Sequence, residues 1–348
     1  MSSPSAAPVG LIANPASGKD VRRLVAHATT VDNQGKVGIV RRAMAGLAAM
    51  GVRRVLAMPD TYHMAERAQV GLGRMGADRL EIELLDMAVT DQSRDSTRAA
   101  RLMREAGCAC IIVLGGDGTS RVVSAGSGDV PLLPISTGTN NVLPVFVEGT
   151  VAGLAAGAIA AGTVPRERAA YQHKWIEVRV DGESRDRALV DVAALAGQFV
   201  GARAIWSVVD LRQLVVTRAD ASSIGISAIA AAVRPIGRDD PAGLELTLGA
   251  GACQVLAAVA PGLIESVGIT GGRLLAVGQT IPAHAERPLV LALDGEREIV
   301  LGAGQEASYT LRQDGPWIVD VASVMETLAA AGSMRCGQDL LDPDKETS

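Results

Sequence analysis

The sequence has very few aromatic residues: three tryptophans, three tyrosines and two phenylalanines among 348 residues. Apolar residues nevertheless make up 48% of the chain, so a core must be built from Ala, Val, Leu and Ile packed closely through Gly and Ala. This composition favours an α/β fold. The chain is also longer than the roughly 100 to 200 residues of a usual domain, so we expect two domains.

Cysteines, clusters of positive charge and long apolar runs are scarce as well. The four cysteines, Cys108, Cys110, Cys253 and Cys336, form no paired zinc motif, and we interpret them as reduced core thiols. The 33 basic and 38 acidic side chains give a net charge of −5 without a Lys/Arg cluster, so we expect no nucleic-acid partner. With neither a signal-peptide pattern nor roughly 18 consecutive apolar residues, we expect a cytoplasmic protein that does not bind membranes.

Several catalytic signatures are absent. The four histidines, His27, His63, His173 and His284, have no metal-ligand spacing, and neither a G-x-S-x-G elbow nor a Walker-type G-x-x-x-x-G-K occurs. Hydrolase and P-loop functions are therefore disfavoured. Near the expected domain boundary, His173-Lys174 and Arg166-Glu167-Arg168 could contact a negatively charged substrate, but we interpret them as solvated linker charges.

The first half of the sequence alternates between strand-like and helix-like segments. The strand-like segments are 9–13, 53–58, 80–85, 108–114 and 130–135, and the helix-like segments are 36–50, 61–75, 91–106 and 150–161. This alternation predicts a mostly parallel sheet covered by helices. We therefore expect an N-terminal α/β nucleotide-binding domain over residues 1–165.

Beyond residue 165 the pattern changes to short strand-like runs, at 175–180, 188–195, 244–248, 253–260 and 289–293. We expect a mainly β, sandwich-like substrate domain over residues 166–305. Within it, Ser223–Val233 fits a helix between the domains or a buried strand equally well. Residues 306–348 contain a strand-like run at 307–312 and a helix-like run at 320–331, and we expect them to return to the N-terminal domain.

The strongest local signal is the turn Gly115-Gly116-Asp117-Gly118-Thr119, which follows the buried strand Ile111–Leu114. Glycines let backbone N–H groups approach phosphate oxygens, and the N-terminus of the following helix adds partial positive charge. The Asp117 carboxylate would repel phosphates unless it holds Mg²⁺ or accepts a hydroxyl proton, so it indicates transfer chemistry. The alternative is an ordinary strand-to-helix turn in which Asp117 caps the helix.

Two other polar loops follow strands, namely Asn14-Pro15-Ala16-Ser17-Gly18-Lys19 and Ser136-Thr137-Gly138-Thr139-Asn140-Asn141. Because the carboxyl ends of parallel strands lie at one edge of a sheet, we expect all three loops to converge. Together they supply hydroxyls, amides and one ammonium group, a donor set that suits a triphosphate. The alternative is three unrelated polar turns.

A fourth candidate is the turn Leu293-Asp294-Gly295-Glu296 in the second domain. Asp-Gly favours a hairpin turn, and the same tripeptide recurs at Asp181-Gly182-Glu183 after a comparable strand. The residues alone do not separate a functional turn from a structural one.

Taken together, the three loops resemble those of the superfamily that unites NAD kinases, diacylglycerol-type lipid kinases and sphingosine kinases, and they occur in the same order. More narrowly, the chain resembles the acetoin catabolism protein X family, an ATP-NAD-kinase-like group. The stretches that carry this likeness are 115–123, 134–144, 148–157, 188–193, 199–206 and 223–231. The likeness extends from Leu11 to about Arg312.

The resemblance implies ATP with Mg²⁺ in a cleft between an α/β domain and a β-sandwich-like domain, and a homo-oligomer, most simply a dimer. The nucleotide-binding candidates are Asn14, Ser17, Gly18, Lys19, Gly115, Gly116, Gly118, Thr119, Thr137, Gly138, Thr139 and Asn140. Catalytic candidates are Asp117, which also matches a metal-proximal acid of NAD kinases, and Glu296 with Asp294, which match the late acidic turn of lipid kinases.

Two departures from the superfamily bear on the acceptor. Val142 stands where lipid kinases carry the Asp of their G-T-x-N-D pattern, which disfavours lipid phosphorylation. The Asn-Glu pair and the Gly-Ser-Thr-Ala-Tyr stretch with which NAD kinases bind NAD are replaced here by Val190-Asp191 and Ser222–Ala228. NAD is therefore one candidate acceptor among several.

We expect an ATP-dependent kinase that transfers a phosphoryl group to a hydroxyl of NAD or a related small metabolite, with Asp117 or Glu296 accepting the proton. The family name suggests a link to acetoin breakdown but specifies no reaction. The alternative from another class is a nucleotide- or NAD-binding regulatory protein without turnover. A lipid kinase is a third, less favoured alternative.

Overall fold

The N-terminal domain is built on a seven-stranded sheet with the order β3-β2-β1-β4-β5-β17-β6. The computed structural model describes residues 6–17, 31–138, 140–197, 208–283 and 288–334. The strands of this sheet are β1 Val9–Ala13, β2 Arg54–Ala57, β3 Glu81–Leu84, β4 Ile111–Gly115, β5 Leu132–Ser136, β6 Ala170–Gln172 and β17 Trp317–Val319. All neighbours pair in parallel except β17 and β6. The predicted mostly parallel α/β domain is confirmed.

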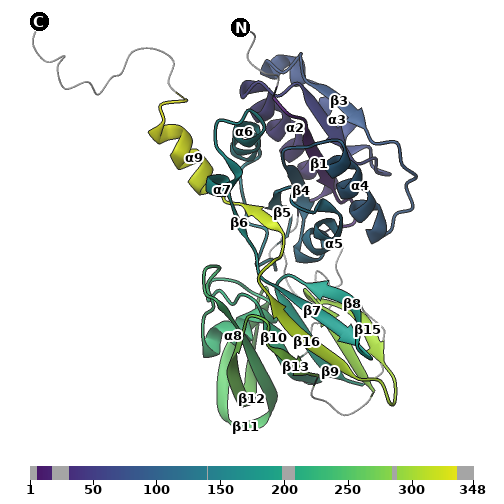
Figure 1. Cartoon of the computed structure of the whole chain (residues 1–348), viewed down its shortest axis with the longest axis vertical. Coiled ribbons are helices and arrows are strands. Elements are labelled where there is room, and N and C mark those ends of the chain that lie inside the picture. Colours follow the sequence, from purple (N-terminus) through teal and green to yellow (C-terminus); the bar gives the residue numbers. More distant parts are fainter. Residues whose placement is uncertain (1–5, 18–30, 139, 198–207, 284–287, 335–348) are drawn as a thin grey trace, which may run out of the picture.

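Helices cover both faces of this sheet (Figure 1). The α-helices of the domain are α2 Asn33–Ala49, α3 Met64–Gln69, α4 Ser93–Glu105, α5 Asp117–Ser127, α6 Gly149–Ala160, the short α7 Arg166–Ala169 and α9 Val321–Ala330. Apolar residues of α2, α3, α6 and α9 form one core with one face of the sheet, while those of α4 and α5 form another core on the opposite face. Alternate residues of each strand therefore enter opposite cores, as the pleat of a strand requires.

The C-terminal domain consists of two antiparallel sheets that pack face to face (Figure 1). One sheet has the order β13-β16-β7-β8, and the other has the order β12-β11-β10-β9-β14-β15. Their strands are β7 Trp175–Val180, β8 Glu183–Ala188, β9 Asp191–Ala196, β10 Leu211–Val216, β11 Ala242–Ala260, β12 Leu263–Ala276, β13 Thr280–Pro282, β14 Leu289–Leu293, β15 Glu296–Leu301 and β16 Ala307–Arg312. Aliphatic residues from both sheets share one core, which confirms the predicted β-rich domain.

Several elements differ from their expected form. The segment Ser223–Val233 contains a helix, α8 (Ser227–Val233), which packs on β10 and β11 inside the C-terminal domain and not between the domains. The runs 244–248 and 253–260 belong to one strand, β11, whose register shifts between Leu248 and Cys253. The helix expected at 61–75 is interrupted at Gly71, which has a φ of 90°. No helix in the described ranges is long and apolar enough to cross a membrane.

The chain passes between the two domains along two adjacent connections. The first leads from β6 to β7 through His173 and Lys174, and the second leads from β16 to β17 through Gly315 and Pro316 (Figure 1). The backbone N–H of His173 donates to Pro316 O at 2.9 Å. Strand β17 thus brings the end of the chain back to the N-terminal sheet, where α9 packs on α6.

His173 and Lys174 are buried, so their interpretation as solvated linker charges was wrong. Nε2 of His173 lies 3.0 Å from Leu189 O. Nζ of Lys174 donates to the carbonyl oxygens of Gly237, Asp240 and Ala242 at 3.3, 2.6 and 2.7 Å. Burial lowers the pKa of Lys174 to about 8, and the two side chains tie this crossing to the C-terminal domain.

Helices α2 and α6 approach so closely that their glycines contact backbone. A Cβ on Gly153 of α6 would overlap Ala43 O of α2, and a Cβ on Gly46 would overlap Thr150 O. A core with few aromatic side chains is filled in this way, through direct contact of backbones.

We expect Gly153→Ala to lower the free energy of unfolding by about 1 to 3 kcal/mol, because neither backbone can move away without disturbing its helix. The matched control is Gly38→Ala on α2, where a Cβ would meet only the flexible end of Arg42. This control should be neutral or up to about 1 kcal/mol more stable, since Ala favours helix. Denaturant titration of both variants measures the difference, and equal stabilities would contradict the packing described.

His173 should make the protein sensitive to acid. Burial lowers the pKa of His173 from 6.5 to about 4, so the folded protein binds fewer protons there than the unfolded chain between these values. The free energy of unfolding should therefore fall by about 3 kcal/mol on this account as the pH decreases from 6.5 to 4. In His173→Gln the fall should be smaller by that amount, whereas the exposed His63→Gln should behave like wild type. Urea unfolding at several pH values tests this, and identical slopes in both variants would exclude it.

Candidate functional site

The three polar loops meet at the carboxyl edge of the N-terminal sheet. Nδ2 of Asn14 donates to Oγ1 of Thr119 at 3.0 Å, which joins the loop after β1 to α5. Oγ of Ser17 lies 3.1 Å from Oγ1 of Thr137, which joins the same loop to the one after β5. The expected convergence is therefore present, and the polar groups of three separate loops form one surface.

Lys36 holds the first of these loops through hydrogen bonds to its backbone. The sequence pattern did not predict this role. Lys36 lies on α2 and is buried, and its Nζ donates to Asn14 O at 2.9 Å and to Ser17 O at 2.7 Å. A buried ammonium group is stable only when it is hydrogen-bonded, and backbone carbonyls fill that role here. Lys36 therefore fixes the course of the first loop. Backbone carbonyl groups leave no sequence motif. The only signal in the sequence is that Lys36 lies in the first turn of a helix whose N-cap is Asp32.

Asp117 is buried at the start of α5, where its carboxylate organises the loop that follows β5. Its Oδ2 accepts the N–H of Val142 at 2.9 Å and its Oδ1 accepts the N–H of Leu143 at 2.8 Å. Its own N–H donates to Oδ1 of Asn141 at 3.3 Å. Asp117 thus has a structural function whatever else it does.

The glycines of the turn are places where another residue would not fit. A Cβ on Gly115 would lie 2.5 Å from Thr119, and a Cβ on Gly116 would lie 2.7 Å from Oδ1 of Asn141. Gly116 precedes α5, whose first turn has N–H groups without partners in the helix. This bare, polarised helix start is a suitable place for phosphate oxygens.

Glu296 of the C-terminal domain lies over the same helix start. Its Oε1 is 3.2 Å from the position of a Cβ on Gly118, and the side chain is partly exposed. The structure therefore places the two carboxylates expected to compete as base, Asp117 and Glu296, at the same end of α5. Of these two, Glu296 retains the more accessible side chain.

Asp294 has a different environment, because its side chain is completely buried. It accepts the N–H groups of Leu189, Val190 and Asp191, the shortest at 2.7 Å. Burial raises the pKa of Asp294 to about 6, against the opposing effect of nearby Arg121 and these N–H groups. Its buried carboxylate holds the hairpin turn against the segment Leu189–Asp191, and the catalytic role expected for Asp294 stays a prediction.

The remaining nucleotide candidates fall into two groups. Gly18, Lys19 and Thr139 lie outside the described residues. Gly138 and Asn140 lie in the loop after β5, where Gly138 O accepts Oγ of Ser136 at 2.6 Å and Nδ2 of Asn141 at 3.3 Å.

No protein-only metal centre is present among the residues that the structure describes, since no group of three or more His, Cys, Asp or Glu could hold an ion. Mg²⁺ that binds together with a nucleotide needs only one or two protein carboxylates besides phosphate oxygens. Asp117 and Glu296 both lie at the start of α5. A carboxylate offers about four lone-pair positions, so accepting backbone N–H groups does not by itself exclude contact with a metal ion.

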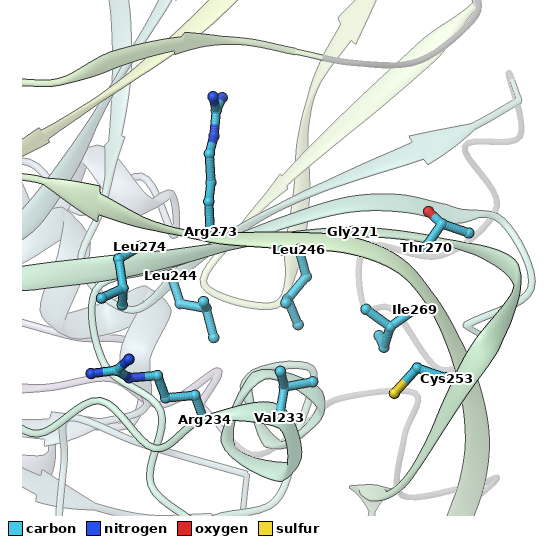
Figure 2. A pocket seen from close by; sticks show the side chains of 11 residues that line it. Val233, Arg234, Leu244, Leu246, Cys253, Ile269, Thr270, Gly271, Arg273 and Leu274 are labelled. Atoms are coloured by element: carbon cyan, nitrogen blue, oxygen red, sulfur yellow. The ribbon is translucent and has the colours of Figure 1, made fainter.

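A separate hollow of about 490 Å³ lies in the C-terminal domain, between the end of α8 and the hairpin of β11 and β12 (Figure 2). Leu244, Leu246 and Val233 point into it, whereas Arg273 points away. Its lining contains no carboxylate, so the acid–base candidates lie elsewhere. Cys253 lies at its wall.

Cys253 is exposed, which corrects its interpretation as a core thiol. Cys108 and Cys110 are buried as expected, and burial raises the pKa of the Cys108 thiol to about 12. Cys336 lies beyond the described residues.

Two family models match different parts of the chain. Residues 9–164 match the ATP-NAD kinase N-terminal domain, and residues 174–314 match the acetoin catabolism protein X C-terminal domain. Acetoin catabolism protein X of Cupriavidus necator is 40% identical over 332 residues, which cover 91% of each chain. The chain belongs to the acetoin catabolism protein X family. Its N-terminal half therefore has the α/β fold of NAD kinases.

Solved structures with a similar fold are more distant. Yeast NADH kinase complexed with NADH has a TM-score of 0.49 and 13% identity, with 97% of this chain and 90% of that chain covered. A putative diacylglycerol kinase from Bacillus anthracis has a TM-score of 0.46 and 14% identity, with 90% and 98% covered.

Asp117→Asn should destabilise the protein by about 1 to 3 kcal/mol, because an amide nitrogen would face the N–H of Val142 or Leu143. The matched control is Asp129→Asn, an exposed aspartate just after α5 that should change stability little. Thermal and urea unfolding measure the effect. Wild-type stability in Asp117→Asn would contradict the structural function given to this carboxylate.

Proposed function

We propose that the protein is an ATP-dependent phosphotransferase that moves a phosphoryl group to a hydroxyl of NAD or a related small metabolite, and that this reaction is linked to acetoin catabolism. The observation that carries the proposal is the position of Glu296, whose carboxylate reaches across from the second domain to Gly118 at the start of α5. A carboxylate that can accept a proton thus lies beside a helix start that suits phosphate oxygens.

The triphosphate would lie on the edge formed by the three loops. Backbone N–H groups at the start of α5, together with Asn14, Ser17, Thr119 and Thr137, supply donors for phosphate oxygens. Mg²⁺ bound with the nucleotide, next to Asp117, would neutralise phosphate charge. The protein itself orients the nucleotide, because Lys36 and the Asp117 carboxylate hold the two flanking loops in place.

Glu296 is the better candidate for the group that accepts the hydroxyl proton. Both oxygens of Asp117 already accept backbone N–H groups, whereas Glu296 is partly exposed at the domain contact. A carboxylate accepts a proton in phosphoryl transfer when it can approach the attacking hydroxyl. We therefore propose Glu296 as the base and Asp117 as the group that organises the loop and accompanies the metal.

The acceptor would face the C-terminal domain. Val142 donates its N–H to Asp117 and is buried, so the position that is acidic in lipid kinases contributes no carboxylate here. This favours a small hydroxylated metabolite over a lipid. NAD and acetoin, the compound after which the Cupriavidus necator relative is named, are the first acceptors to test.

A regulatory protein that binds nucleotide or NAD without turnover is the second candidate. The observation that favours it is the double backbone capture of Asp117, which leaves one of the two expected acids with a structural task. Incubation with MgATP and a panel of acceptors distinguishes the two candidates. Nucleotide binding without ADP formation for any acceptor would favour the regulator.

Glu296→Gln should lower kcat for transfer roughly 100-fold or more, because the amide cannot accept the proton. Affinity for MgATP should stay within about threefold of wild type, since the phosphate donors are unchanged. The control is Glu306→Gln, an exposed glutamate between β15 and β16 that should leave both quantities unchanged. Assays of ADP release and equilibrium nucleotide titration decide the matter. Full activity in Glu296→Gln would remove Glu296 as the base.

The homodimer implied by the family resemblance stays a prediction. Sedimentation or size-exclusion analysis of the full chain tests it.

A further inference from the structure

Arg121 connects the helix of the phosphate site to the opposite domain. It lies on α5 four residues after Asp117, and only 5% of its side chain is exposed. Its Nη1 donates to Oδ2 of Asp186 on β8 at 2.9 Å, and its Nε lies 3.6 Å from Oδ2 of Asp294. One guanidinium from the N-terminal domain therefore serves two carboxylates of the C-terminal domain.

The contact with Asp294 fixes more than one side chain. Asp294 and Gly295 form the turn between β14 and β15, with φ angles of 50° and 80°. The Asp294 carboxylate also collects three successive N–H groups from the connection between β8 and β9. The next residue after this turn is Glu296. Whatever fixes Asp294 therefore fixes the starting point of the Glu296 side chain.

Helix α5 links both ends of this arrangement. Gly118, which lies beneath the Glu296 carboxylate, and Arg121, which holds the turn, are three residues apart on the same helix. Residues three or four apart lie on the same side of a helix. One turn of helix α5 therefore fixes the distance between Gly118, which Glu296 faces, and Arg121, which contacts the β14–β15 turn before Glu296.

We propose that Arg121, through Asp294 and Asp186, is a positioning residue that sets the carboxylate of Glu296 over the start of α5 and keeps the two domains in register for transfer. The expected effect on catalysis rests on the proposed function, but the effect of Arg121 on the position of the turn does not depend on turnover. We call the three side chains the Arg121 latch.

The chemistry of Arg121 fits this role better than that of a lysine. A planar guanidinium presents several N–H groups in fixed directions and can contact two carboxylates at once, whereas an ammonium group is a compact point charge on a flexible stem. Arg121→Lys keeps the charge beside Asp294 but should lose the double contact. The charge-conserving variant therefore separates positioning from simple neutralisation.

The experiment compares Arg121→Lys and Asp186→Asn with Arg185→Lys, a control that makes the same chemical change at an exposed arginine on the same strand as Asp186. Hydrogen exchange of peptides spanning 189–196 and 289–301 is measured without ligand, MgATP affinity is measured by titration, and kcat and KM are measured for an acceptor that wild type uses. Asp186→Asn leaves the Arg121–Asp294 contact intact, so it provides a second, milder variant if Arg121→Lys fails to fold.

We expect faster exchange in both peptides for the two latch variants. MgATP affinity should remain within about threefold of wild type, while kcat falls roughly 100-fold, as a small misplacement of a reacting group would produce. Arg185→Lys should match wild type in every measurement. A role limited to general stability would alter exchange across the whole chain and leave kcat of the folded protein unchanged.

The outcomes distinguish the latch from the proposed function. Unchanged exchange in Arg121→Lys and Asp186→Asn overturns the latch, even if wild type is an active kinase. Faster local exchange with unchanged kcat overturns the positioning role. If wild type transfers to no acceptor, the proposed function fails, and localised exchange in the two peptides still decides whether the latch holds the turn.

Discussion

The arrangement of the site depends on buried carboxylates that accept hydrogen bonds from backbone N–H groups. Asp117 holds the loop after β5 in this way, and Asp294 holds the connection between β8 and β9. A buried N–H without a partner destabilises a fold by about 1 to 3 kcal/mol, so irregular segments are rarely buried unless something accepts their bonds. Apolar side chains of both segments enter the same core beneath the sheet. The two carboxylates therefore allow two loops from different domains to be packed against each other.

Much of the fold follows from the pattern of apolar residues and turns. Strands β1, β7, β14 and β16 have the bounds that the sequence predicts, because each is a short apolar or alternating run with a clear turn beside it. The meeting of the three polar loops is also predictable, since parallel strands place their carboxyl ends together. The structure of Ser227–Val233 was not decided by its sequence, because a short apolar segment suits a helix or a strand equally well.

The charged residues that shape the site could not be found in the same way. Lys36, Arg121 and Lys174 are buried beside partners distant in sequence, and the partners of both lysines include backbone carbonyl oxygens. Carbonyl groups occur at every position and leave no motif. Nor do the residues alone distinguish Asp294-Gly295-Glu296 from Asp181-Gly182-Glu183, which only the family resemblance separates. The structure shows that the first turn reaches α5, while Asp181 contacts Gln305 and Glu306 at an exposed position.

The two connections between the domains, β6 to β7 and β16 to β17, lie next to each other. Everything from β7 to β16 leaves and re-enters the N-terminal domain at one place, and the family match to the C-terminal domain, residues 174–314, begins and ends there. The C-terminal domain is thus a single insertion in the N-terminal α/β domain, whose sheet β17 completes after the insertion. Because only two neighbouring connections join the inserted domain to the N-terminal domain, its strands can lengthen or shorten without changing the strand order of the N-terminal sheet.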